Sequence, residues 1–336
     1  MIPWRIFTIE IGLYIEAIII LRGLKKSQMV VAVSNTTDYK AMICQKYNAM
    51  FEDRTAGLDR LEFVMAVLGP ETKSILLRHE ACYVLGQMKD KRAVPLLTKI
   101  LNDDSEHEIT RHEAAEALGA IGDDDAMMCL CQYTASESVP LKETCELGVD
   151  RLQNAQVESG DFNTIDPVAL EKGSVQATES DIDSLLEKLL DPATSLNDKY
   201  KCLFSLRTIT DSDHKPSIKA IIALGRALRD EKTSALLRHE IGFVIGQLAF
   251  GVCASLIPTC IDSLQNSVCD STEHCMVRHE AAIALGSIAG QNESIEEFLT
   301  KYAQLPINES NQDEAIVIES CLVATESLRY WRNHSC

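Results

Sequence analysis

The chain has 336 residues, of which 46% are hydrophobic and 24% charged, and this excludes a globally disordered chain because enough apolar side chains are present to bury a core. Aromatic residues (5%), glycine (16) and proline (9) are scarce, which argues against a β-sandwich or barrel and favours an all-α protein. The 50 acidic and 32 basic residues give a net charge of -18, so we expect a cationic partner and no nucleic acid.

Residues 1–37 are predicted to form an N-terminal extension. The apolar stretch from Ile6 to Leu24 follows Arg5, as in a signal peptide, but Glu10 and Glu16 interrupt it and no small-residue cleavage site follows. No uncharged stretch of the chain approaches the roughly 18 residues that are needed to span a bilayer. We therefore expect no association with a membrane.

The tripeptide Arg-His-Glu occurs four times, and each time a glycine follows the histidine by seven residues. The first two of these histidines are 33 residues apart and the last two are 40 apart. A period of this size is typical of an all-α solenoid in which each unit is a helical hairpin. The four segments read LLRHEACYVLGQMKD from Leu76, ITRHEAAEALGAIGD from Ile109, LLRHEIGFVIGQLAF from Leu236 and MVRHEAAIALGSIAG from Met276.

A second, longer repeat relates the two parts of the chain. Upstream of each pair of Arg-His-Glu segments, the pattern Lys46-Tyr47, Phe51, Arg54-Thr55 recurs as Lys199-Tyr200, Phe204, Arg207-Thr208. We predict two pseudo-symmetric halves that face each other, residues 38–153 and 185–336. Residues 154–184 are rich in acidic and small polar side chains and lack an apolar period, so they are predicted to be a flexible acidic linker.

The histidines of the repeat are predicted to lie opposite the apolar core. In the first segment the apolar residues have helical spacing and lie roughly 120–200° around the helix from His79; they are Leu77, Ala81, Val84, Leu85 and Met88. A core histidine would lie within this stripe, so we expect His79 and its three counterparts on the inner surface of the solenoid. The repeated glycine, Gly86 in this segment, indicates either close helix packing or an open cavity beside the histidine.

Histidine and glutamate at four equivalent positions indicate metal ligation. Neighbouring helix axes are about 8–10 Å apart, so imidazoles from two helices can converge on one ion. Each half then offers two histidines and at least one carboxylate, a ligand set typical of non-haem Fe2+, and two facing sets predict a pair of ions. Hydrolytic manganese or zinc pairs remain open on the ligands alone. The alternative is a plain repeat scaffold whose consensus contains His-Glu.

Three other features of the sequence have simpler interpretations. The pair His107-Glu108 lacks the preceding arginine and is predicted to lie in a solvated loop. The twelve cysteines include no Cys-x-x-Cys pair, which indicates reduced thiols and a cytoplasmic protein. The arginines before the four histidines either pair with acidic neighbours or orient the adjacent carboxylates; they are Arg78, Arg111, Arg238 and Arg278.

On these residues the sequence resembles the deoxyhypusine hydroxylases, a family of HEAT-repeat di-iron monooxygenases. The resemblance covers residues 38–332 and rests on the four segments, the duplication, the acidic linker and strings such as LGQMKDKRAVP and HEAAEALGAIGDD. It implies a protein substrate, translation initiation factor five-A carrying deoxyhypusine, which is a lysine extended by an aminobutyl group. It also implies two Fe2+ ions, with dioxygen as co-substrate and hypusine as product. We expect a monomer.

The resemblance assigns a role to each residue of the four segments. It implies that one iron is bound by His79, His112 and Glu113 and the other by His239, His279 and Glu280. Glu80 and Glu240 would lie close to the irons and face the amines of the substrate, as catalytic residues that bind substrate, and they also belong to the candidate metal ligands. Met276 would lie near the substrate entrance.

The longer spacing between the last two segments predicts a surplus in the loop around Gln265–Cys275. Two competing hypotheses remain. A non-catalytic HEAT-repeat interaction scaffold predicts no bound metal and tolerance of His79→Ala. A chromophore-attaching lyase with HEAT-like repeats would not need His-Glu pairs in register.

Overall fold

The computed structural model describes residues 36–51, 60–153, 166–168, 176–232, 234–250, 252–288, 293–308 and 310–334. The chain in these ranges forms helices and two isolated β-bridges but no β-strand, which confirms the predicted all-α solenoid of helical hairpins. Most of the predicted N-terminal extension lies outside the described residues, and the first described helix begins at Thr36, inside that extension. No described helix has both the length and the apolar character to cross a membrane.

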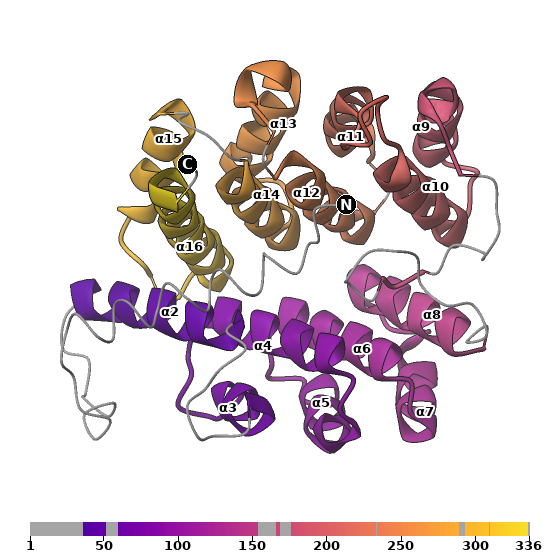
Figure 1. The fold of residues 1–336 in the computed structure, drawn as a ribbon. Coiled ribbons are helices and arrows are strands. Elements are labelled where there is room, and N and C mark those ends of the chain that lie inside the picture. The colour runs from indigo at the N-terminus through magenta and orange to yellow at the C-terminus, as the bar shows by residue number, and fades with distance from the viewer. Residues whose placement is uncertain are drawn as a thin grey trace.

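Each half consists of an inner row and an outer row of helices (Figure 1). In the first half the inner row is α2 (Thr36–Phe51), α4 (Ile75–Met88), α6 (Glu108–Ile121) and α8 (Val139–Gln153), and the outer row is α3 (Arg60–Val67), α5 (Val94–Leu101) and α7 (Asp124–Tyr133). In the second half the inner row is α10 (Leu196–Thr208), α12 (Ala235–Ala249), α14 (Cys275–Ser287) and α16 (Gln312–His334), and the outer row is α9 (Ile182–Leu190), α11 (Ile218–Asp230), α13 (Pro258–Cys269) and α15 (Glu293–Ala303).

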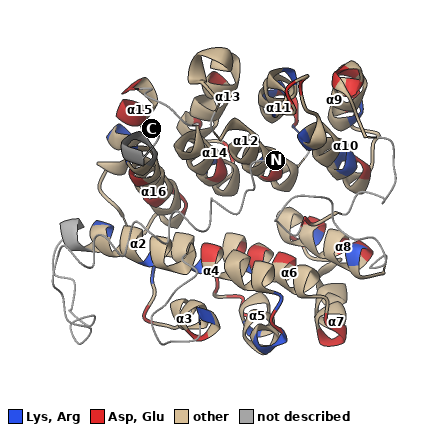
Figure 2. Ribbon diagram, in the orientation of Figure 1, with Lys and Arg blue, Asp and Glu red and all other residues tan. Residues whose placement is uncertain are grey.

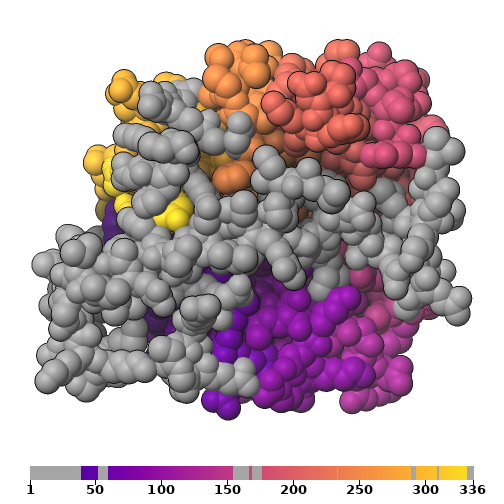
Figure 3. All heavy atoms as spheres, viewed as in Figure 1, coloured from indigo at the N-terminus to yellow at the C-terminus, as the bar shows by residue number. Residues whose placement is uncertain are grey.

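The two inner rows face each other, and the halves form two blocks in the space-filling view (Figures 1 and 3). Helix α16 packs against α2 and α4 at one end of the boundary, and α12 packs against α8 at the other. Two hydrophobic clusters, one largely in each half, fill the space between the inner and outer rows. The polar residues between the inner rows therefore form a third, enclosed layer.

The start of each inner helix sets the height of its motif histidine. Helix α4 is capped by Ser74 and α12 by Ser234, whose hydroxyl groups accept hydrogen bonds from backbone N–H groups of the first turn. In α6 and α14 the cap is an imidazole, that of His107 or His274, with Nδ1 as the acceptor. Every motif histidine follows its cap by five residues, so the four side chains leave their helices at equivalent heights.

The interpretation of His107-Glu108 as a solvated loop is wrong. His107 caps α6, and its Nε2 lies 3.1 Å from a carboxylate oxygen of Asp313, in the first turn of α16. Glu108 is the first residue of α6, and it accepts a hydrogen bond from Nε2 of His274 at 3.0 Å. Both contacts join the two halves, which the local sequence pattern does not reveal.

The repeated spacing of the motif glycines reflects close helix packing. A Cβ on Gly86 would lie 2.8 Å from Cα of Ala117 in α6, and one on Gly286 would lie 2.7 Å from Cα of Ala324 in α16. Since real Cβ atoms do not approach backbone this closely, glycine lets each inner helix contact the next. Of the two expectations, close packing is the one the structure shows.

Part of the segment predicted as a flexible linker is packed between the halves. Asp166 is buried, and its carboxylate accepts hydrogen bonds from both terminal nitrogens of Arg207 in α10. The backbone carbonyl of Asp166 accepts a hydrogen bond from Arg151 in α8. Helix α9 also begins at Ile182, before the predicted end of the linker.

The structure also shows where the surplus residues of the second half lie and what state the cysteines are in. The surplus of the second half lies mainly in a longer outer helix, α13, which runs to Cys269, so the prediction of a loop from Gln265 was wrong. The extra turn continues the apolar face through Val268, which is fully buried. All eleven cysteines that the structure describes are free thiols.

Candidate metal centre

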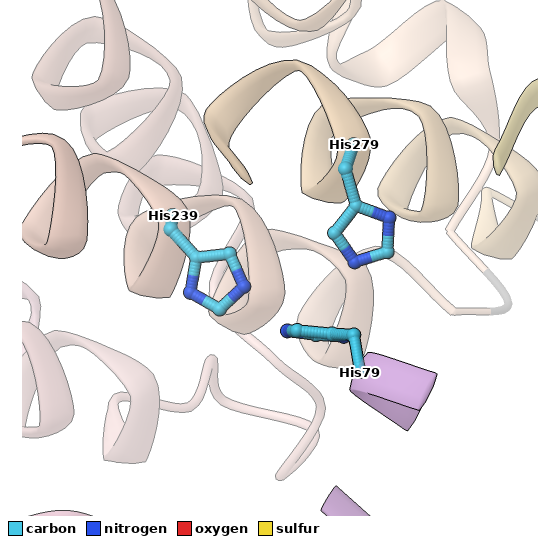
Figure 4. A group of neighbouring side chains, drawn as sticks. All are labelled: His79, His239 and His279. Carbon is cyan, nitrogen blue, oxygen red and sulfur yellow. The ribbon is translucent and has the colours of Figure 1, made fainter. Parts of the chain in front are cut away.

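The four motif histidines converge between the inner rows. The ring centroids of His79 and His279 are 4.9 Å apart, those of His112 and His239 are 5.4 Å apart, and those of His79 and His112 are 5.7 Å apart. Figure 4 shows His239 and His279 projecting from neighbouring helices of the second half toward His79 of the first half. All four side chains are buried, and none points to an outer wall of the solenoid.

Two glutamates stand between pairs of these imidazoles. One carboxylate oxygen of Glu113 lies 3.2 Å from Nε2 of His79 and 3.6 Å from Nε2 of His112. One oxygen of Glu280 lies 3.6 Å from Nε2 of His239 and 3.5 Å from Nε2 of His279. The structure thus brings together the members of both ligand sets that the resemblance implies.

Among the described residues, three groups of three have donor atoms within 4.8 Å of one another, close enough to surround an ion, and two of these groups belong to this centre. One group is His79, His112 and Glu113. The other is His79, His239 and His279, so His79 belongs to both. Nitrogen and oxygen donors without thiolate suit iron, manganese or zinc rather than a structural zinc-thiolate site.

Glu80 and Glu240, which occupy equivalent positions in the two halves, have different surroundings. A carboxylate oxygen of Glu80 lies 3.6 Å from Nε2 of His279 and 3.8 Å from Nδ1 of His79. The carboxylate of Glu240 lies within ion-pair distance of no imidazole among the described residues. Burial raises the pKa of Glu240 well above its ordinary value, and the negative charges of Glu116 and Asp166 add to the shift.

The protonation of three of the four imidazoles suits metal binding. Burial lowers the pKa of three of them well below the ordinary value, with neighbouring imidazoles adding to the shift; these are His112, His239 and His279. Burial also opposes the charging of His79, but Glu113 and Glu80 outweigh it and raise the pKa of His79 to about 10. Burial, followed by the charge of Glu80, raises the pKa of Glu280 to about 8. The positive charge near the crowded carboxylates is therefore too small to balance their negative charge, and bound cations would supply the remainder.

Unpaired imidazole nitrogens are the observation that tests whether a metal fits. Buried nitrogens without a hydrogen-bond partner include both ring nitrogens of His79 and His239 and Nε2 of His112 and His279. An unsatisfied buried polar atom costs about 1–3 kcal/mol, so six of them in one place require compensation. Metal ions between these atoms would provide it, and the residues fit a metal pair.

Two hydroxyl residues next to this centre were missed by the sequence analysis. The Oγ1 atom of Thr144 in α8 lies 3.3 Å from Nδ1 of His112, and Oγ of Ser320 in α16 lies 2.8 Å from Nδ1 of His279. A signal was present, because Glu143-Thr144-Cys145 and Glu319-Ser320-Cys321 are the same motif in the two halves. The motif does not contain Arg-His-Glu, so it is not part of the repeat on which the predicted metal ligands are based.

The motif arginines do not touch the metal-site carboxylates. Arg78 donates hydrogen bonds to Glu106 and to the carbonyl oxygen of Leu68. Arg238 donates to Glu273 at 2.9 and 2.7 Å. In the same way, Arg111 contacts Leu101 and Asp104, and Arg278 contacts Val268 and Glu314. Of the two expectations, pairing with acidic neighbours is the one observed, and the arginines fasten the turns between repeats.

A pocket lies at the α8 end of the boundary between the halves. Its wall includes the Glu116 side chain, one turn after His112, and it reaches Thr144 behind the histidine. Its lining comes from α6, α8, the linker and the start of α12 and consists of Glu116, Gly119, Ala120, Thr144, Leu147, Gly148, Arg151, Asp166, Pro167 and Leu236. Acidic residues occur on helices of both inner rows, including α4 and α6 of the first half and α14 of the second (Figure 2).

Met276 lies in the first turn of α14 and has no exposed surface. Its side chain is part of the hydrophobic cluster of the second half. The expectation that it borders a substrate entrance stays a prediction.

The comparisons with known proteins agree on one family. A model of HEAT repeats matches residues 65–146. The mouse deoxyhypusine hydroxylase is 35% identical over 305 residues, which cover 90% of this chain and 92% of the mouse protein. The fruit-fly deoxyhypusine hydroxylase is 38% identical over 262 residues, which cover 76% of this chain and 77% of the fly protein. A solved structure of human deoxyhypusine hydroxylase in complex with glycerol aligns with a TM-score of 0.70 and 29% identity over 97% of this chain and 99% of the human chain. The chain belongs to the deoxyhypusine hydroxylase family.

Proposed function

We propose that this protein converts deoxyhypusine in translation initiation factor five-A to hypusine, with dioxygen as co-substrate, at two Fe2+ ions. The observation that carries the proposal is the convergence of unpaired, buried imidazole nitrogens from both halves on shared carboxylates. One ion would be held by His79, His112 and Glu113, and the other by His239, His279 and Glu280.

The substrate bond requires an oxidant, because an aliphatic C–H bond does not react with acids or bases. A pair of irons supplies the electrons needed to activate dioxygen for this insertion. The chain's own contribution is to hold the reacting carbon beside the metals and to exclude water, and the burial of all four histidines favours this.

Carboxylates next to the metals would orient the substrate. The deoxyhypusine side chain carries two amines, which are cationic at neutral pH. Glu80 and Glu240 are both buried, and a desolvated contact between ammonium and carboxylate is stronger than an exposed ion pair. We propose that these two glutamates receive the amines, so that one of the methylenes between the two nitrogens faces the metals.

The net charge and the origin of the site residues support the proposed substrate, a monomeric protein and a cytoplasmic reaction. A net charge of -18 would attract a basic substrate loop over a distance. The two halves of one chain complete the centre, so a monomer suffices. A translation factor as substrate places the reaction in the cytoplasm.

The experiment measures iron and product together. The purified protein should contain about two irons per chain, and with dioxygen and a reductant it should add one oxygen atom to the deoxyhypusine-containing factor, as seen by mass spectrometry. The variants His112→Ala and His279→Ala should lose iron and activity. His214→Asn provides the control, because His214 is exposed in a turn with φ 59°, a conformation that asparagine tolerates.

The interaction-scaffold alternative makes the opposite prediction. A wild-type protein that folds and binds its partner without any metal, together with an unaffected His79→Ala variant, would support the scaffold and exclude the oxygenase.

A further inference from the structure

Thr144 and Ser320 are two hydroxyl residues outside the Arg-His-Glu segments. They occupy equivalent positions in α8 and α16, the last inner helix of each half. Each is buried, with an exposed fraction of 3% for Thr144 and 0% for Ser320. Each lies beside the second motif histidine of its own half, His112 or His279.

The hydrogen bonds of these hydroxyls determine which imidazole nitrogen carries the proton. Thr144 donates its hydroxyl proton to the carbonyl of Pro140 at 2.9 Å, and Ser320 donates to the carbonyl of Ile316 at 2.7 Å. A hydroxyl has one proton, so toward the imidazole each oxygen can only accept. The Nδ1 atoms of His112 and His279 must therefore carry the protons.

A proton on Nδ1 leaves the lone pair on Nε2, and Nε2 is the atom that faces the metal centre. The Nε2 atom of His112 lies 3.6 Å from Glu113, and that of His279 lies 3.5 Å from Glu280. Both Nε2 atoms are buried without a hydrogen-bond partner. In metal sites, a partner on the second nitrogen fixes the ring orientation and raises the basicity of the ligating nitrogen.

We propose that Thr144 and Ser320 are positioning residues of the metal centre, which hold His112 and His279 with Nε2 directed at the metals before the metals bind. The first motif histidines differ, because both nitrogens of His79 and His239 lack a hydrogen-bond partner. Each half thus combines one imidazole whose Nδ1 is held by a hydroxyl group with one that has no hydroxyl partner. This proposal rests on the metal centre of the proposed function and adds residues that do not touch the metal.

The glutamate before each hydroxyl residue, Glu143 or Glu319, forms a hydrogen bond with the opposite half. Glu319 accepts a hydrogen bond from Ser74 at 2.6 Å, and Glu143 accepts one from Ser234 at 2.7 Å. Ser74 and Ser234 are the caps of α4 and α12, which carry the two histidines without a hydroxyl partner. Each Glu-Ser or Glu-Thr pair therefore orients a histidine of its own half and fastens the start of the histidine-bearing helix across the boundary.

The test replaces each hydroxyl with a side chain of similar shape. Thr144→Val replaces the hydroxyl with a methyl group of similar size, and Ser320→Ala removes the hydroxyl at the other site, whereas Thr144→Ser and Ser320→Thr keep a hydroxyl. The primary measurement is the affinity for Fe2+, obtained by competition with a chelator, together with the optical spectrum of the iron-loaded protein. We expect Val and Ala to weaken iron binding by about 10–100-fold and the hydroxyl-retaining variants to restore it.

Thr325→Val is the matched control. Thr325 is buried in α16 and donates its hydroxyl proton to the carbonyl of Cys321 at 2.7 Å, as Ser320 does to Ile316, but its hydroxyl has no hydrogen bond to a histidine of the described residues. Removing its hydroxyl should change stability without changing iron affinity. Thermal unfolding of all variants without metal separates a loss of folding from a loss of metal affinity.

The outcomes are distinguishable from those of the proposed function. Unchanged iron affinity in Thr144→Val and Ser320→Ala, or a loss no greater than in Thr325→Val, would overturn the positioning proposal. A wild-type protein that binds iron but does not hydroxylate the factor would contradict the proposed function alone. A wild-type protein with no affinity for iron would contradict both the positioning proposal and the proposed function.

Discussion

A carboxylate oxygen of Glu80 in the first half lies 3.6 Å from Nε2 of His279 in the second half. The equivalent glutamate, Glu240, makes no such contact with an imidazole among the described residues, and burial and the negative charges of Glu116 and Asp166 raise its pKa. The pseudo-symmetry of the sequence therefore does not extend to these two carboxylates. We therefore expect Glu80 to contribute to metal retention as well as to substrate binding, and Glu240 to substrate binding alone.

Glu80→Gln should weaken metal retention, whereas Glu240→Gln should not. The Glu80 carboxylate is close to two imidazoles, so its charge stabilises a nearby cation directly, while no imidazole of the described residues lies within ion-pair distance of Glu240. Iron content after dialysis should fall several-fold in the first variant and stay at the wild-type level in the second. In Glu240→Gln, kcat/KM for the protein substrate should fall instead. Equal iron loss in both variants would show that the carboxylates act alike.

Asp166→Asn should destabilise the protein strongly. The Asp166–Arg207 pair is nearly inaccessible, with side-chain exposures of 7% and 2%, so the substitution removes a buried negative charge that lies against the guanidinium. Breaking a buried pair in this way costs about 3–5 kcal/mol, measured as the free energy of unfolding in urea. Asp90→Asn removes a similar pair with Arg92, whose side chain is 61% exposed, and should have no measurable effect. Equal effects of the two substitutions would contradict the assigned importance of burial.

The sequence predicted the helical architecture and the convergence of the histidines for a clear reason. His79 and its counterparts occupy one register of a repeat, and a repeat places equivalent residues at equivalent heights. The same reasoning failed for Asp166, because acidic and small polar neighbours look like a linker whether or not one of them finds a buried arginine. It also missed the hydrogen bonds of Thr144 and Ser320, which depend on how α8 packs on α6 and α16 on α14.

Gly286→Ala should be more destabilising than Gly246→Ala. A Cβ on Gly286 would come within 2.7 Å of backbone in α16, whereas one on Gly246 would lie 3.3 Å from Cα of Ala284. The first substitution must push two inner helices apart, at a cost of about 1–3 kcal/mol. In the second, a smaller repulsion is offset by the helix preference of alanine, about 0.5–1 kcal/mol. Chemical denaturation measures both, and a reversed order would mean that these contacts do not limit the helix spacing.

Glu116 should make the stability of the metal-free protein depend on pH. Burial, followed by the charge of Glu113, raises the pKa of Glu116 from 4.5 to about 8 in the folded protein. The folded state then holds a proton that the unfolded state releases above pH 4.5, so this stabilisation is complete below that pH and is lost as the pH rises toward 8. The melting temperature of the wild type, relative to Glu116→Gln, should fall between pH 5 and 8 and change little at higher pH.

The comparison with glutamine isolates this one carboxyl group, because the other titrating groups of the centre are present in both proteins. Glu146→Gln is the matched control, since Glu146 is an exposed residue of the neighbouring helix α8. Its melting temperature should follow the wild type at every pH. The opposite result would be a melting temperature of the wild type that rises relative to that of Glu116→Gln above pH 5. It would mean that Glu116 is ionised and paired in the folded protein. The pocket would then already contain the positive charge that we assign to metals and substrate.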